Sequence, residues 1–118
     1  MRIAQDTAAL DRMFFALADA SRRVMLDHLT DSPASVSELA RPLGIALPSV
    51  VKHLAVLESG GLVVSQKAGR VRTYQIAPGA LAAMEAWVSE RKMRLNHQFD
   101  RLDAYLAGQA VEEKGTKL

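Results

Sequence analysis

The spacing of apolar residues predicts two helices near the start of the chain. The first set has the i, i+3, i+4, i+7 spacing of an amphipathic helix that packs inward, and it consists of Leu10, Met13, Phe14 and Leu17. We expect this helix to run from about Asp6, as its N-cap, to Ala18. A second helix should follow an N-cap at Ser21. Its predicted buried side is formed by Val24, Met25 and Leu29.

A short third helix is predicted after a loop at residues 31–33. Ser35 and Glu38 have the spacing of a capping box, in which each side chain accepts a hydrogen bond from the other residue's backbone N–H. The helix should contain Leu39, Ala40 and Leu43, and it should end by Gly44, because glycine enters the left-handed region at no steric cost.

A fourth helix should begin near Pro48, whose fixed φ suits the first helical turn, and should stop at Gly60-Gly61. Two short helices joined by a tight turn that contains glycine predict a helix-turn-helix. A helical hairpin without a binding role would have the same pattern. The segments that follow are therefore needed to choose between these two interpretations.

Two strand-like runs follow, Leu62–Gln66 and Val71–Ile76, with a turn through residues 67–70. A hairpin directly after a helix-turn-helix is the arrangement of a wing. Its predicted tip carries Lys67 and Arg70, with Arg72 close behind. A solvated hairpin does not need basic residues at its tip, whereas a hairpin that lies along a phosphate backbone does.

The last predicted helix runs from about Ala80 to Ala107, after Pro78-Gly79. Its apolar residues repeat at seven-residue intervals with further members between them, namely Leu81, Met84, Val88, Leu95, Phe99, Leu102 and Leu106. A helix of about 27 residues reaches ~40 Å, which is longer than so small a body can cover. We expect the remaining apolar stripe to meet a second copy of the chain, although it could instead belong to the core of one subunit.

The length and composition predict a single domain over residues 1–107 and a disordered tail over residues 108–118. The 118 residues of the chain are 49% apolar and 24% charged, as in ordinary folded proteins. They include no cysteine, which excludes disulfides and thiolate metal sites. The chain has neither a membrane-spanning apolar run nor a secretion signal, so we expect a cytoplasmic protein with no membrane partner.

Positive charge is concentrated in one segment of a nearly neutral chain. Residues 47–76 contain four basic residues against the single acid Glu58, a net charge of +3, while the rest of the chain sums to −1. This distribution favours a polyanionic partner, although four basic residues can also form a solvated face.

Three segments together resemble the ArsR/SmtB family of bacterial regulators: "LADASRRVMLDHL", "SVSELARPLGIALPSVVKHLAVLESGGLV" and "GRVRTYQI". The resemblance covers about residues 8 to 106. It implies a mainly α fold with a small β-hairpin, that is, a winged helix-turn-helix that forms a homodimer through its terminal helices. Members of the family bind pseudo-palindromic operators in double-stranded DNA and usually repress transcription.

The resemblance also assigns candidate site residues. On the recognition helix and wing, the positions that would face DNA are Pro48, Ser49, Lys52, His53, Lys67, Arg70 and Arg72. The residues expected at the dimer interface are Leu10, Phe14, Leu81, Met84, Val88, Leu95, Phe99 and Leu102.

Several of these assignments have alternatives. Ser49 could be an ordinary first-turn residue, and His53 could be a packed core histidine. Arg22 and Arg23 could reach phosphates or could make contacts within the chain.

The metal sites of the family are not reproduced. Its carboxylate and imidazole site on the last helix is represented only by His97 and Asp100, and the partner positions hold Met84 and Ala86, which are poor ligands. We therefore expect no metal and no cofactor. Any trigger would be an unidentified small molecule or a partner protein.

Two other classes of function compete with DNA binding. Leu47 and Val51 are apolar where the family is commonly polar, so the same face could bind a protein. An enzyme is not expected, because the sequence contains no nucleophile-base pair, phosphate-binding glycine loop or paired carboxylates.

Overall fold

The computed structural model describes residues 2–116, with side chains for residues 7–109. In chain order the elements are α1 (Arg2–Leu17), α2 (Ala20–Asp31), β1 (Ala34–Ser35), α3 (Val36–Leu43), α4 (Leu47–Ser59), β2 (Val63–Ala68), β3 (Val71–Ile76) and α5 (Ala82–Thr116). The chain divides into two compact units, Met1–Ala83 and Met84–Leu118. Each unit is described by itself.

The first two helices form where the sequence predicts them but begin earlier. Because α1 starts at Arg2, Asp6 lies inside the helix and is not its N-cap. The N-cap of α2 is Asp19, whose carboxylate accepts a hydrogen bond from the backbone N–H of Ser21 at 3.1 Å, so the prediction of Ser21 as the N-cap was wrong.

The buried side of α2 differs from the prediction at one residue. Met25 and Leu29 are buried as expected, but Val24 is exposed and Arg22 is buried instead. The reason is geometric: Arg22, Met25 and Leu29 are spaced i, i+3, i+7 and share one face, whereas Val24 is turned about 100° from Met25.

The predicted capping box at the start of α3 is confirmed. The N–H of Ser35 donates to Glu38 Oε1 at 3.1 Å, and the N–H of Glu38 donates to Ser35 Oγ at 3.3 Å. The hydrogen bonds from the Ser35 backbone and side chain hold the pKa of Glu38 below its usual value. The helix ends as predicted at Gly44, which has φ +64°.

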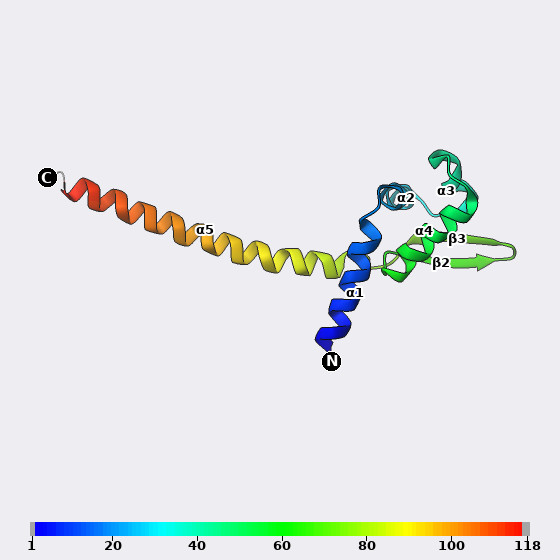
Figure 1. Cartoon of the computed structure of the whole chain (residues 1–118), viewed down its shortest axis with the longest axis horizontal. Helices are drawn as coiled ribbons and strands as arrows, with labels where there is room; N and C mark the ends of the chain where they lie inside the picture. The colour runs from blue at the N-terminus through cyan, green and yellow to red at the C-terminus, as the bar shows by residue number, and fades with distance from the viewer. Residues whose placement is uncertain (1, 117–118) are drawn as a thin grey trace. The chain divides into compact units, whose positions relative to one another are not determined.

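The hairpin of β2 and β3 (Figure 1) is part of a three-stranded antiparallel sheet with strand order β1-β3-β2. The two-residue strand β1, which the sequence did not predict, pairs Ser35 with Thr73. The turn between β2 and β3 is shorter than predicted, with only Gly69 and Arg70 between the paired Ala68 and Val71. Gly69 has φ +64°, as required at the first central position of a type II′ turn.

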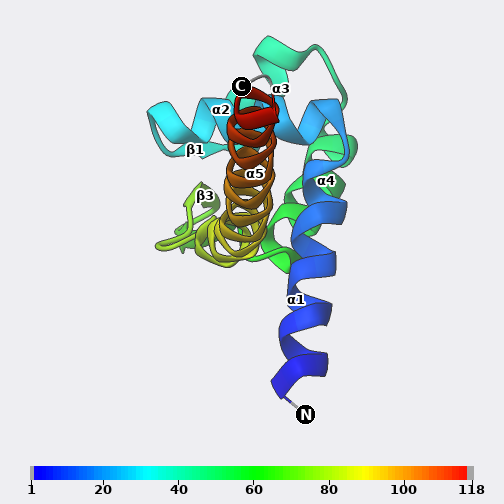
Figure 2. The same cartoon turned by 90° about the vertical axis from the view of Figure 1, so that its left-hand side faces the viewer.

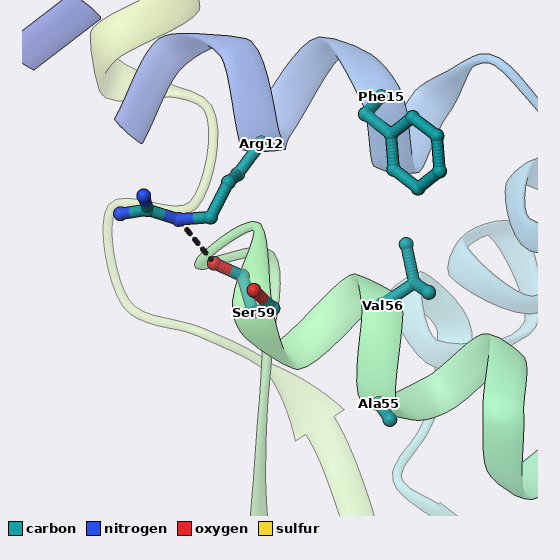
Figure 3. Close-up of a pocket in the computed structure, with 5 residues that line it drawn as sticks. All are labelled: Arg12, Phe15, Ala55, Val56 and Ser59. Atoms are coloured by element: carbon teal, nitrogen blue, oxygen red, sulfur yellow. Dashed lines mark hydrogen bonds between the residues drawn. The ribbon is translucent and has the colours of Figure 1, made fainter. Parts of the chain in front are cut away.

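The core of the first unit joins α1–α4 to the sheet. Its fully or nearly fully buried side chains include Met13, Ala16, Met25, Leu29, Leu39, Val50, Leu54, Leu57, Leu62, Val63 and Tyr74. Figure 2 shows α1 running beside α4, and Figure 3 shows Phe15 lying over Val56 and Arg12 reaching Ser59. The Arg12 Nε donates to the Ser59 carbonyl at 3.3 Å. The end of α4 is therefore packed directly on α1.

Gly60, the residue that follows α4, packs closely against α1. A Cβ at this position would lie 3.0 Å from the Arg12 carbonyl oxygen and 3.1 Å from the Ala16 Cβ. The backbone φ of −78° is suitable for any residue, so the constraint is steric only. This contact explains a glycine at the helix end that positive φ does not require.

We expect Gly60→Ala to lower the free energy of unfolding by about 1–3 kcal/mol, as overpacking usually does. Urea denaturation followed by circular dichroism measures the change. A double-mutant cycle with Ala16→Gly isolates the contact, because removing the opposing methyl group should recover part of the lost free energy of unfolding. Strictly additive effects in the double mutant would contradict a direct clash with Ala16.

The second unit consists of the rest of α5. This helix was expected to span residues 80–107, with residues 108–118 as a disordered tail, but it runs from Ala82 to Thr116. The residues after Ala107 include good helix formers, and a single glycine at Gly108 costs a helix only about 1 kcal/mol. The last two positions, 117 and 118, lie outside the described residues.

Side chains along α5 remain largely exposed. Of the predicted stripe, Leu81, Val88, Leu95, Phe99 and Leu102 are all at least 40% exposed, and Met84 is half-buried. Within the described part of the chain, no single helix is long and apolar enough to cross a membrane; the pair α3 and α4 passes by length and composition but is bent by 111°.

Candidate nucleic-acid interface

The outer face of α4 presents the side chains that the sequence assigned to recognition. Val50, Leu54 and Leu57 are fully buried and fix the orientation of the helix. Lys52 therefore points outward and is exposed, as predicted. The other exposed residues on the first turns of α4 are Leu47, Pro48, Ser49 and Val51.

His53 is half-buried at the edge of this face, and its ring contacts Arg22. The Arg22 Nη1 lies 3.4 Å from the His53 Nδ1. Arginine can only donate, so in the neutral ring Nδ1 accepts and the ring proton is on Nε2. That N–H is a donor suited to a phosphate oxygen. The alternative of a packed histidine therefore applies to the Nδ1 side of the ring, which contacts Arg22.

Arg22 makes its contacts within the chain. Its Nε donates to the Ala16 carbonyl at 2.7 Å, and its Nη2 donates to the Phe15 carbonyl at 2.9 Å. These hydrogen bonds satisfy two backbone carbonyls at the end of α1 and join it to α2, while the contact with His53 connects Arg22 to α4. Arg23 is exposed and donates to the Leu17 carbonyl at 2.6 Å. The alternative of intramolecular contacts is therefore the observed one for Arg22.

The wing concentrates positive charge on one side of the hairpin. Lys67 does not lie in the turn as predicted but in β2, where it is paired with Arg72 of β3, and Arg70 occupies the turn. Like charges directly opposite each other in an antiparallel pair destabilise the hairpin. An anion near Lys67 and Arg72 would remove that repulsion.

The start of α3 lies next to the wing. A shallow pocket there is lined by Ser35, Val36, Ser37, Arg70, Val71 and Arg72. In Figure 1 the hairpin of β2 and β3 starts beside α4 and extends past it, and β2 contacts α4. The structure thus brings Arg70 and Arg72 of the wing next to the first turn of α3.

One contact in the wing was not predicted from the sequence. The Arg72 Nη1 donates to Ser65 Oγ at 2.8 Å, and the Ser65 hydroxyl donates to Glu58 Oε1 at 3.0 Å. Ser65 and Arg72 are two positions apart across the strands, so only the hairpin register could have indicated the contact.

Among the described residues, no group of three or more histidine, cysteine, aspartate or glutamate side chains could hold a metal ion. His97 and Asp100 are both exposed on α5, where Met84 and Ala86 supply no further ligand. The donor set seen here does not fit a closed zinc site.

Comparisons with known proteins define the family. Residues 17–66 match the family model described as a helix-turn-helix domain. The chain is 45% identical over 74 residues to the HTH-type transcriptional regulator Rv2034 of Mycobacterium tuberculosis, an alignment that covers 63% of this chain and 69% of that protein.

Solved structures agree with this assignment. A crystal structure of an ArsR family transcriptional regulator is 43% identical, has a TM-score of 0.72, and is matched over 76% of this chain and 93% of that one. The homodimeric winged helix-turn-helix DNA-binding domain Mb0332 of Mycobacterium bovis is 31% identical with a TM-score of 0.65, over 81% of this chain and 90% of that one.

The chain belongs to the ArsR family of winged helix-turn-helix transcriptional regulators. The fold class and family expected from the sequence are thereby confirmed.

Proposed function

We propose that the protein is a homodimeric repressor that binds a pseudo-palindromic operator. The observation that carries the proposal is the exposure of Lys52 on α4 together with the basic residues Lys67, Arg70 and Arg72 on the wing that follows this helix. In each subunit α4 would enter the major groove, with Ser49 near a base edge or phosphate, Lys52 on a guanine or a phosphate, and His53 on a phosphate. Repression would follow from operators that overlap the promoter.

The dimer would form through the terminal helices. The exposed stripe of α5 and the α1 residues Leu10 and Phe14 supply the apolar surface, while charges of both signs balance around it. Two-fold symmetry would then place two copies of α4 on successive turns of DNA, as a palindromic operator requires.

The repressor would act without a metal. The proposal rests on the missing thiolates and on the isolated pair His97 and Asp100. Its effector would be a small molecule or a partner protein, and it would act in the cytoplasm, where the DNA is.

Fluorescence anisotropy with DNA from the protein's own promoter and a scrambled duplex, both with EDTA present, tests the proposal. We expect promoter-selective binding that weakens by about tenfold or more in Lys52→Ala and in Arg70→Ala. Arg101→Ala removes an exposed charge from α5 at a position off the apolar stripe and should bind like the wild type. Unchanged affinity in both α4 and wing variants would overturn the proposed face.

A protein-binding role is the second candidate, because Leu47 and Val51 are about half exposed on the outer face of α4. It predicts no binding to either duplex at low salt. Under DNA recognition, these side chains would instead contact thymine methyl groups.

A further inference from the structure

The wing contains a short hydrogen-bond chain that connects three elements. Glu58 lies in the last turn of α4, Ser65 in β2 and Arg72 in β3. The Ser65 hydroxyl donates to Glu58 Oε1 at 3.0 Å and accepts from the Arg72 Nη1 at 2.8 Å. Ser65 is half-buried, while both charged partners are exposed.

The direction of this chain is determined by its donors and acceptors. A carboxylate can only accept and a guanidinium can only donate, so the single Ser65 proton goes to Glu58 and a lone pair is left for Arg72. The bond to Ser65 uses one of the five N–H groups of Arg72, so the guanidinium keeps donors for an outside acceptor.

Without the hydrogen bond from Ser65, the Glu58 carboxylate would be in an unfavourable electrostatic environment. A carboxylate in the last turn of a helix is disfavoured by the helix dipole, and α4 has no basic residue in that turn. Its charge would also repel a phosphate backbone bound at the neighbouring wing. The hydrogen bond to Ser65 gives this carboxylate a structural role.

We propose that Ser65 and Glu58 are positioning residues that hold the Arg72 guanidinium ready to contact a DNA phosphate. The inference rests on the proposed DNA binding. An arginine side chain loses considerable rotamer freedom when it binds, and ordering it beforehand removes part of that cost. The same chain ties β2 to the end of α4, so the wing and the recognition helix are held together.

The first test uses the free protein and requires no DNA. The ¹⁵N relaxation of the Arg72 Nε–H gives an order parameter, which we expect to fall in Ser65→Ala and to stay at the wild-type value in Ser65→Thr, because threonine keeps the hydroxyl. Equal mobility of Arg72 in the wild type and Ser65→Ala would overturn the proposal, whatever DNA the protein binds.

The second test measures affinity for a mixed-sequence duplex long enough for two half-sites, because a phosphate contact does not depend on sequence. We expect Ser65→Ala to bind about two- to tenfold more weakly and Ser65→Thr to bind like the wild type. In an Arg72→Ala background, Ser65→Ala should have no further effect, since the residue that it positions is gone.

Glu58 provides a comparison at constant charge. Glu58→Gln and Glu58→Ala both remove the negative charge, but only glutamine keeps an acceptor for the Ser65 hydroxyl. We expect tighter DNA binding in Glu58→Gln than in Glu58→Ala. Equal affinities would show that Glu58 acts through its charge alone and would overturn its positioning role.

These outcomes separate the inference from the proposed function. If the wild type binds no duplex, the proposed function fails, and the inference that depends on it fails too. If the wild type binds and Arg72→Ala weakens binding while Ser65→Ala does not, DNA binding stands and the positioning role is wrong. If Arg72→Ala binds like the wild type, Arg72 makes no contact to be positioned, and the inference is again wrong.

Discussion

Leu95→Glu is expected to convert the protein to a monomer and to lower operator affinity by about a hundredfold or more, the range in which linked binding sites gain over single ones. Leu95 is half exposed in the middle of the apolar stripe of α5. Glutamate there would bury an unpaired charge in the proposed interface, which costs several kcal/mol. Sedimentation velocity measures the assembly, and anisotropy measures the loss of DNA binding.

Met93→Glu is the matched control for this experiment. Met93 is also on α5 and is 73% exposed, but it lies two residues from Leu95 and so about 200° around the helix. The same charge at position 93 should leave the dimer and its DNA affinity intact. If Leu95→Glu sediments as a dimer, the stripe is not the interface and belongs to another contact.

Raising the salt concentration fourfold is expected to lower the association constant for DNA by about 10⁴-fold. Four basic residues on each subunit face the proposed DNA, namely Lys52, Lys67, Arg70 and Arg72. If all eight of these contacts in a dimer neutralise phosphates, the slope of log K against log salt is about −7. Anisotropy titrations across a salt series measure that slope.

Arg70→Ala should make this slope shallower by about 2, because one phosphate contact is lost in each subunit. Arg101→Ala, which removes a charge from α5 away from the apolar stripe, should leave the slope unchanged. A slope near zero for the wild type would rule out phosphate contacts of this kind and would favour the protein-binding candidate.

Local features of the sequence predicted the fold well where a single residue determines the backbone. The capping box of Ser35 and Glu38 and the left-handed Gly44 fix the two ends of α3, and both are present. The extent of β3 was predicted correctly from its composition alone. These predictions needed no knowledge of distant contacts.

Features that depend on tertiary contacts were missed. The strand β1 has only two residues and exists because it pairs with β3, so no periodic pattern indicates it. Arg22 replaces Val24 on the buried face because carbonyl oxygens at the end of α1 are within its reach. A long polar side chain can be buried when its donors are satisfied, and this cannot be read from hydropathy.

The candidate site follows the same division. The exposure of Lys52 followed from the apolar spacing of its neighbours on α4. The contact of His53 with Arg22 joins residues 31 positions apart, and the Ser65 chain depends on the pairing of β2 with β3. Sequence pattern therefore identified the residues that face outward but not the residues that hold them.

The tight turn at Gly69 determines more than the end of the wing. With two residues in the turn, Lys67 stands opposite Arg72, and both side chains leave the same face of the hairpin. A slip of one residue in the pairing would turn one strand over and place the two cations on opposite sides. Gly69 thus determines whether Lys67 and Arg72 form one cationic surface or lie on opposite faces of the wing.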